Sequence, residues 1–432
     1  MLKNSFLKNI LIKDKFIKNS ALLFFAMMFG NVFGYLFQLS MGRMLSVEAY
    51  GEMNALMSLM IIFGIPFGAF INFFAKQTAT YSSKEEQNKI RQLHKSGIKN
   101  ILWWMVPVLI LLSFASPVIG DFLNVSFSKV LMVMICIFLT SIITVNTGII
   151  QGLQYFKSLA VIGSCAHFFR FMFGVLFVWM GFGVLGAIGA VIGAGFVLLL
   201  YSHWRIISSL PSQQCELNLN FKSIYKYAGG LFFANAMFAI MTQADLLLVK
   251  HYFSAGDAGL YASAAILGKA VMYLPGAIVM AMFPMVAANH TTGKSSFGML
   301  CKALVLTTCL SGGGALVLYL YPEFILNMLF GTKYLTAAPI CALFGISMVP
   351  VSLLFLLMNY LLAQGKTGFL FLMGICTTVE LAGIVFFNDN NLRNILYSIM
   401  VAGSLLFVPL FFKVLYDDCI TQIQKARILK QT

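Results

Sequence analysis

Residues 21–39 read ALLFFAMMFGNVFGYLFQL, an apolar run without a charged side chain. A helix needs about 20 mostly apolar residues to cross the hydrocarbon core of a bilayer. A second, mostly apolar run extends from Ile98 to Ala115. Neither run alternates strictly between apolar and polar residues, as a lipid-facing strand of a membrane barrel would. The two runs therefore predict helices that span a membrane.

The composition extends this prediction to the whole chain. Of its 432 residues, 60% are hydrophobic and only 10% are charged, whereas a soluble domain carries about 25% charged residues. The mean hydropathy is +0.89. Because backbone groups in hydrocarbon must form their hydrogen bonds within the protein, only helices or a closed barrel can span it. We predict an all-α membrane protein.

We expect about twelve transmembrane helices, in two lobes of six. The lysine-rich start resembles a secretory signal peptide, but the apolar run after it is too long and no small-residue cleavage site follows, so the first span is expected to remain. The predicted parts are a basic N-terminus (1–18), a first lobe (19–204), a linker (205–223), a second lobe (224–416) and a tail (417–432). The predicted spans cover residues 19–42, 51–75, 98–117, 128–150, 158–180, 184–204, 224–250, 257–288, 298–320, 334–362, 367–387 and 394–416.

Basic residues fall unequally on the two sides of these spans. Of the 29 lysines and arginines, 22 lie on the side of the N-terminus and five on the opposite side. Because cytoplasmic loops are enriched in Lys and Arg, this bias predicts that both termini are cytoplasmic. Lys89 and Gln213 are then expected in the cytoplasm, and Asp121 and Asn390 in the periplasm.

Other classes of protein have little support. The topology explains the net charge of +15, and no basic stripe outside the membrane indicates binding of nucleic acid. None of the eight cysteines forms a C-x-x-C pair and the five histidines lack metal-ligand spacing, so no metal or other cofactor is predicted. The longest connections, Lys76–Gly97 and Arg205–Ser223, are too short for a separate domain.

The two halves of the chain resemble each other at an offset of about 209 residues. Residues 45–55, LSVEAYGEMNA, and residues 253–263, FSAGDAGLYAS, each form a small polar turn with an acid and a glycine. The long helices that follow are both expected to break at proline, at Pro66 and Pro275. These matches indicate an internal duplication.

A further match joins residues 146–152, NTGIIQG, to residues 359–365, NYLLAQG. With six spans in each repeat, both copies have the same orientation in the membrane. Parallel six-helix halves are typical of transporters, whose substrate path lies at the interface of the repeats. The alternative is a duplication retained for folding alone.

Four ionisable residues fall inside the predicted spans: Arg170, Asp245, Lys269 and Glu380. At the bilayer centre each costs roughly 2.5–3.5 kcal/mol on insertion scales, so they are expected to face protein or a water-filled cavity. With two bases and two acids, they are also able to pair with one another. The repeat aligns Arg170 with Glu380, which would face each other across a central cavity if each faces the symmetry axis. We favour this cavity role over a static packing pair.

A second aligned pair, Arg43 and Lys250, lies near the outer ends of the first and seventh spans. Two cations at this level would form a basic collar around the substrate path. Alternatively, each side chain extends from the end of its helix to water, as basic residues often do. The sequence leaves both interpretations open.

These motifs, taken in order, resemble those of the multidrug/oligosaccharidyl-lipid/polysaccharide exporter superfamily. The similarity is specifically to its polysaccharide branch, the O-antigen (Wzx-type) flippases, and covers nearly the full length. The segments that carry it are Gly42–Leu45 with Tyr50-Gly51, Gln151–Gln154, Ala244–Val249, Gly256–Tyr261 and Gln364–Lys366.

The resemblance implies two six-helix lobes in a V that opens alternately to each side of the bacterial inner membrane. It implies no enzyme activity, but transfer of undecaprenyl-pyrophosphate-linked sugar repeats to the periplasmic leaflet for O-antigen, lipopolysaccharide, capsule or exopolysaccharide synthesis. A polymerase and a chain-length regulator are potential partners, and coupling to H⁺ or Na⁺ stays open. The alternatives are a multidrug or cation antiporter of this fold, with Asp245 and Glu380 as ion carriers, and a membrane-embedded polymerase or acyltransferase.

For such a substrate, basic residues would lower the barrier to moving an anionic pyrophosphate, and arginine matches phosphate through its planar fork. Amide side chains near the same level would contact the sugars. The candidate cavity residues are therefore Arg43, Arg170, Lys250, Lys269, Asp245, Glu380, Asn31, Gln38, Asn235 and Gln243.

Overall fold

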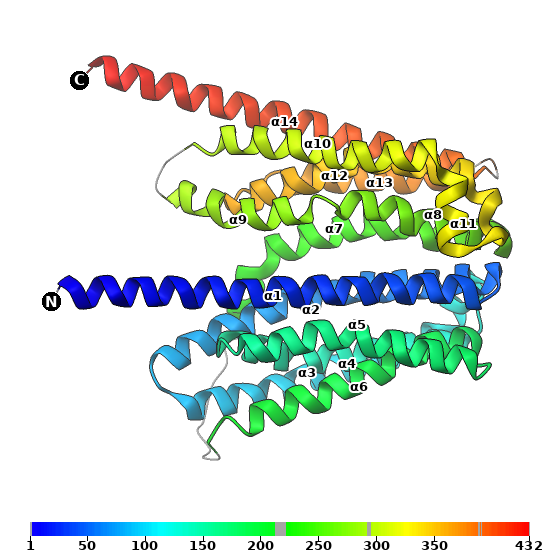
Figure 1. The fold of residues 1–432 in the computed structure, drawn as a ribbon, viewed down its shortest axis with the longest axis horizontal. Helices are drawn as coiled ribbons and strands as arrows, with labels where there is room; N and C mark the ends of the chain where they lie inside the picture. The colour runs from blue at the N-terminus through cyan, green and yellow to red at the C-terminus, as the bar shows by residue number, and fades with distance from the viewer. Residues whose placement is uncertain (1, 212–221, 292–294, 388, 390, 432) are drawn as a thin grey trace. The chain divides into compact units, whose positions relative to one another are not determined.

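The computed structural model describes residues 2–211, 222–291, 295–387, 389 and 391–431. All regular secondary structure in these residues is helical (Figure 1). The chain divides into two compact units, Met1–Phe232 and Phe233–Thr432. The all-α prediction is confirmed.

In the first unit, the helices α4 and α5 are central, and the other helices pack against them. Helix α4 packs against α2, α3 and α6, and helix α5 packs against α1 and α6. The helices are α1 (Leu2–Met44), α2 (Val47–Ser83), α3 (Gln87–Leu123), α4 (Phe127–Gly152), α5 (Phe156–Trp179) and α6 (Gly183–Ile207), followed by α7 (Lys222–Tyr252), which continues into the second unit.

In the second unit, α12 is the central helix and packs against α8, α9, α10 and α14. Helix α13 packs against α14. The elements after α7 are α8 (Ala255–Tyr273), α9 (Gly276–Thr291), α10 (Phe297–Leu320), α11 (Pro322–Phe330), the 3-10 helix η1 (Thr332–Ala337), α12 (Ala338–Ala363), α13 (Leu370–Phe386) and α14 (Leu392–Gln431).

The two units repeat the same pattern of helix packing, as an internal duplication predicts. The pairs α2–α4, α3–α4, α4–α6 and α5–α6 of the first unit correspond to α8–α12, α10–α12, α12–α14 and α13–α14 of the second. The aligned serines of the repeat also have the same local role. Ser46 caps α2 by accepting a hydrogen bond from the Ala49 amide, and Ser254 caps α8 by accepting one from the Asp257 amide. Each supplies a partner for a backbone donor that the helix itself leaves free.

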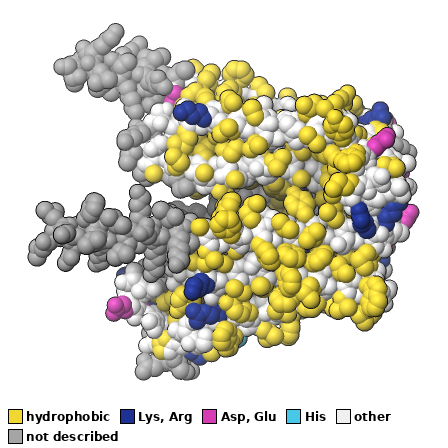
Figure 2. Space-filling view, viewed as in Figure 1, with side chains coloured by type: hydrophobic (Ala, Val, Ile, Leu, Met, Phe, Trp, Pro, Cys, Tyr) yellow, Lys and Arg dark blue, Asp and Glu magenta, His cyan; other side chains and the backbone are white. Residues whose placement is uncertain are grey.

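Eleven helices among the described residues are long and apolar enough to cross a membrane, and the shorter helix Leu370–Phe386 is also apolar. This agrees with the expected number of about twelve spans. Large apolar side chains such as Phe114 and Trp103 are 80% and 73% exposed, as lipid-facing residues should be. Figure 2 shows hydrophobic side chains over much of the face in view, with charged side chains toward the ends. The chain is a multi-pass membrane protein.

Several helix limits differ from the prediction. The expected connection Lys76–Gly97 is mostly helical, because α2 ends at Ser83 and α3 begins at Gln87. Likewise α1 begins at Leu2 and α14 ends at Gln431, so both basic termini continue helices. Hydropathy locates where a helix leaves hydrocarbon, but a polar helix continues readily in water. Helices α11 and η1 were not predicted.

The prolines of the repeat behave differently. The backbone breaks between α8 and α9 at Pro275, as predicted, whereas α2 is continuous through Pro66 and that prediction is wrong. A proline removes one backbone hydrogen bond, which a long helix in contact with neighbours can tolerate.

Much of the predicted linker 205–223, including Gln213, lies outside the described residues, and so does Asn390.

Close approach of α2 and α4 depends on glycine. A Cβ atom at Gly148 would lie 2.6 Å from the Phe74 Cβ and 2.8 Å from the Ile71 carbonyl oxygen. In membranes, small residues permit such contacts between helix backbones. We expect Gly148→Ala to cost about 1–3 kcal/mol through overpacking and to lower the midpoint of thermal unfolding in detergent by several degrees.

The matched control is Gly163→Ala on α5, where an added Cβ would have no atom within 4 Å. Since alanine favours a helix over glycine, this variant should be as stable as the unmodified protein or more so. Equal midpoints for the two variants would contradict the packing role of Gly148.

Candidate functional site

A buried ion pair joins two helices of the second unit. The Lys269 ammonium on α8 donates a hydrogen bond of 2.9 Å to Oδ1 of Asp245 on α7. The Tyr261 hydroxyl, also on α8, donates to Oδ2 of the same carboxylate at 3.1 Å. Tyr261 and Lys269 lie on one face of α8 because they are about two helical turns apart. Of the four ionisable residues predicted inside spans, the structure pairs these two.

Glu380 on α13 is the third charged residue of this buried cluster. It is 1% exposed, and its Oε2 atom has no hydrogen-bond partner. Its strongest electrostatic interactions are with Asp245 and Lys269. Among the described residues, the ammonium bonds only to Asp245, but the two carboxylates and the ammonium are close enough to interact, and the three groups formally carry one negative charge if all are ionised. An arrangement of this kind can hold one further proton or cation.

Arg170 on α5 has a different environment, in the first unit. Its guanidinium carbon lies 4.7 Å from the centre of the Phe37 ring on α1, and its Nε atom has no hydrogen-bond partner. No carboxylate among the described residues lies within ion-pair distance of Arg170. The cation is thus held against an aromatic face, a favourable contact, and no described carboxylate compensates its charge.

Glycine allows α1 to approach α5 beside this arginine. A Cβ atom at Gly34 would lie 3.3 Å from Nδ1 of His167 and 3.7 Å from an Arg170 guanidinium nitrogen. A Cβ at Gly30 would lie 3.1 Å from the same histidine ring. A larger residue at Gly34 would therefore crowd the guanidinium group.

Arg170 and Glu380, which the repeat aligns, thus have different local partners. Arg170 lies against Phe37, and Glu380 interacts with Asp245 and Lys269. That the two face each other across a cavity stays a prediction.

The remaining predicted site residues are distributed along α1 and α7. Arg43 is exposed in the last turn of α1, whereas Lys250, at the matching place on α7, is only 5% exposed. The amides divide in the same way: Asn31 and Asn235 are exposed, Gln38 is half-buried and Gln243 is buried. Gln38 accepts a long hydrogen bond of 3.5 Å from the Tyr50 hydroxyl.

Sequence reasoning missed two polar contacts. One is Tyr261, whose spacing from Lys269 along α8 was a usable signal. The other links three helices of the first unit: Nε2 of His94 lies 2.9 Å from Oδ1 of Asn146, whose amide nitrogen donates to the Ser202 hydroxyl at 2.9 Å. No local pattern connects these three residues.

Nowhere in the described part of the chain do three His, Cys, Asp or Glu side chains gather as a metal site.

The arrangement of helices is that of a known class of transporter. The structure resembles the lipid II flippase MurJ in an inward closed conformation, with a TM-score of 0.72 and 15% identity over 92% of this chain and 87% of that one. It also resembles an inward-facing multidrug resistance MATE family transporter of the MOP superfamily, with a TM-score of 0.70 and 12% identity over 91% and 96% of the two chains. These similarities show the fold.

The chain belongs to the family described as polysaccharide biosynthesis protein, whose model matches residues 16–290. A protein of the Lsg locus of Haemophilus influenzae is 25% identical over 228 residues, which make up 52% of this chain. The chain spans about half of that relative, 56% of its length. The superfamily assignment drawn from the sequence motifs is confirmed, and its members are transporters and flippases. Neither the family description nor these two solved structures indicate an enzyme.

The buried ion pair yields a test of stability. In Lys269→Met, Asp245 would be left as an uncompensated buried carboxylate beside Glu380, at a cost of about 3–5 kcal/mol. The double variant Asp245→Asn/Lys269→Met removes both charges and should recover much of this loss. Thermal unfolding of the purified proteins in detergent measures both effects.

The control is Lys366→Met, which removes a second Lys–Asp pair of the same unit. Lys366 and Asp417 are 3.5 Å apart with side chains 47% and 45% exposed, and such exposed pairs contribute about 0–1 kcal/mol. If the double variant were as unstable as Lys269→Met, the uncompensated Asp245 carboxylate would not be the cause of the lost stability.

Proposed function

We propose that this protein is a flippase for undecaprenyl-pyrophosphate-linked oligosaccharides, which it moves from the cytoplasmic to the periplasmic leaflet of a bacterial inner membrane. The products would serve O-antigen, capsule or exopolysaccharide synthesis. The single observation that carries the proposal is Arg170, a guanidinium in a spanning helix without a carboxylate partner among the described residues. Membership of the polysaccharide biosynthesis family supports the same class of substrate.

The chemical argument concerns the charge of the substrate. A pyrophosphate is anionic and strongly hydrated, so its transfer through a region of low dielectric constant requires a compensating cation. Arginine offers a planar set of donors that binds phosphate oxygens two at a time. The Phe37 ring holds the guanidinium in place without neutralising it. Arg170 would therefore bind the pyrophosphate during transfer.

The sugars need a different surface. Asn31 and Tyr35 lie one helical turn apart on α1 and are both exposed, and Asn235 is exposed on α7. Amides and aromatic faces are suitable partners for sugar hydroxyls and rings. We place these residues along the path of the glycan, with Arg43 and Lys250 at its outer end. The periplasmic product would pass to a polymerase and a chain-length regulator.

One observation favours a second candidate, a multidrug or cation antiporter. Asp245 and Glu380 are buried acids, and Oε2 of Glu380 has no hydrogen-bond partner. Such acids could carry H⁺ or Na⁺ in exchange for a cationic drug. We prefer the flippase because Arg170 would repel a cationic substrate, whereas Lys269 already compensates Asp245 within the cluster.

The flippase proposal is tested by complementation of a flippase-null strain, with surface glycan as the readout. We expect Arg170→Ala to reduce the glycan to background although the protein still inserts. Arg170→Lys should restore only part of it, because lysine keeps the charge but lacks the fork. The control Arg393→Ala, at an exposed position, should export normally. Undiminished export by Arg170→Ala, at equal protein levels, would refute the role of this residue.

Two roles of Glu380 within the flippase predict different results. Glutamine keeps the shape of the side chain and removes its charge. If Glu380 is a passive charge beside Asp245 and Lys269, Glu380→Gln should keep full export. The double variant Arg170→Leu/Glu380→Leu should then lose export, because it lacks the arginine. If Glu380 carries a coupling ion, Glu380→Gln should lose transport while membrane levels stay unchanged. We expect the first pattern, measured with the same surface glycan assay.

A further inference from the structure

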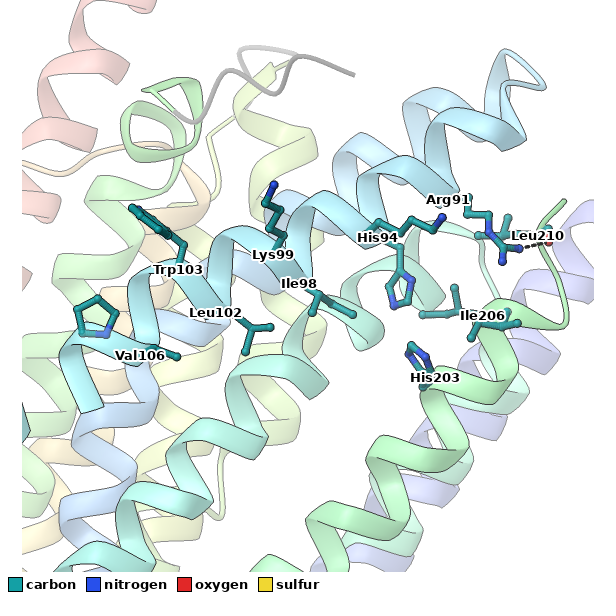
Figure 3. A pocket seen from close by; sticks show the side chains of 13 residues that line it. Arg91, His94, Ile98, Lys99, Leu102, Trp103, Val106, His203, Ile206 and Leu210 are labelled. Carbon is teal, nitrogen blue, oxygen red and sulfur yellow. Dashed lines mark hydrogen bonds between the residues drawn. The ribbon is translucent and has the colours of Figure 1, made fainter. Parts of the chain in front are cut away.

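A pocket of about 740 Å³ lies in the first unit, between α3 and α6 (Figure 3). Its α3 wall is a single helical stripe, because its members recur three or four residues apart from Arg91 to Val106. Its α6 wall consists of His203, Ile206, Ile207 and the following Leu210. The pocket contains none of the residues assigned above to the flippase path.

One end of the pocket is basic. Lys95 and Lys99, one turn apart on α3, are both exposed, and no carboxylate in the described part of the chain pairs with either. Arg91 lies one turn before them, where its guanidinium donates to the carbonyl oxygens of Leu210 and Pro211 at 2.9 and 3.2 Å. These bonds join α3 to the residues that follow α6, and they hold the Arg91 guanidinium at the basic end of the pocket. Three positive charges therefore lie along two turns of one helix, and no carboxylate among the described residues forms an ion pair with them.

The rest of the pocket is apolar. Beyond Lys99 the α3 wall consists of Leu102, Trp103, Val106 and Pro107. From Ile98 to Pro107 the helix rises about 14 Å, which matches the ~15 Å depth of one leaflet, half of a ~30 Å hydrocarbon core. Trp103 is 73% exposed, so the apolar wall is open to lipid.

The polar groups at the back of the pocket already have partners. Figure 3 shows His94 and His203 pointing toward each other, and their ring centres are 5.3 Å apart. His94 is also bonded to Asn146, as described above. The histidines thus belong to the framework of the unit, and the free donors are the two lysines.

From this arrangement we propose that the pocket binds one anionic membrane phospholipid, with its phosphate at Lys95 and Lys99 and one acyl chain along Leu102, Trp103 and Val106. Charge and shape both select this occupant. Basic pockets between membrane helices bind anionic lipid headgroups, and the apolar wall is as long as one leaflet is deep. A polyprenyl chain extends well beyond that depth, which favours a phospholipid over the transported substrate.

Trp103 supplies a reporter for the test. In a variant with Trp104, Trp179 and Trp204 replaced by phenylalanine, all exposed positions, Trp103 is the only tryptophan. The full chain is reconstituted into phosphatidylcholine vesicles that contain a small share of one brominated lipid. This lipid is either brominated phosphatidylglycerol or brominated phosphatidylcholine, and its bromine atoms quench a neighbouring indole. We expect Trp103 to select brominated phosphatidylglycerol about fivefold or more over brominated phosphatidylcholine, as for one or two lysines near an anionic headgroup.

Paired charge variants locate the site. Lys95→Gln/Lys99→Gln should abolish the preference. Lys76→Gln/Lys84→Gln, which removes the same charge from exposed positions near the end of α2, should keep it. Circular dichroism and size-exclusion profiles confirm that each variant is folded.

Three results would overturn the proposal: equal quenching by both lipids in the parent protein, a preference that survives loss of Lys95 and Lys99, or a preference lost equally in the Lys76/Lys84 control. A further arm adds undecaprenyl phosphate to the same vesicles. Displacement of brominated phosphatidylglycerol by a small mole fraction of it would identify the polyprenyl lipid as the occupant and refute the phospholipid. Because this readout is lipid binding, it is independent of glycan export.

Discussion

Hydrocarbon offers no water to a polar group, and this constraint explains most of the structure. In the described residues, backbone groups meet it by forming helices, one of the two solutions that hydrocarbon allows. An ionisable side chain in a span must find a partner within the protein or face a water-filled space. The second unit satisfies the constraint by bringing Asp245, Lys269 and Tyr261 together with bonds of about 3 Å. In the first unit, no described carboxylate pairs with Arg170, which lies against the Phe37 ring instead.

The same absence of water changes how helices are held together. Lipid tails solvate apolar side chains as well as another helix does, so close packing replaces the hydrophobic effect as the source of association. Gly148 and Gly152 accordingly bring α4 against α2, where no larger side chain fits. The second unit repeats the helix pairs of the first with different residues. Duplication has preserved the packing scheme while allowing the charges to diverge.

The sequence predicted what depends on composition and short-range order. The number of spans, the repeat and the break at Pro275 follow from hydropathy and turn residues, and they agree with the structure. It could not predict contacts that depend on how helices rotate about their axes. The bonds of His94 to Asn146 and of Tyr261 to Asp245 join residues from different helices. The start of α3 at Gln87 was missed because its first turns are polar, although they are helical.

The pairing of Asp245 with Lys269 has a consequence for biogenesis. The two residues lie on consecutive helices, α7 and α8, which are joined by a short turn at Phe253 and Ser254. Either helix alone would present an uncompensated charge to lipid as it left the translocon, at a cost of roughly 2.5–3.5 kcal/mol. If the two helices are released together as a hairpin, the two charges would neutralise each other before reaching hydrocarbon. The order of synthesis places the counter-ion of Asp245 in the next helix along the chain, so the second unit would enter the membrane with its first charge already balanced.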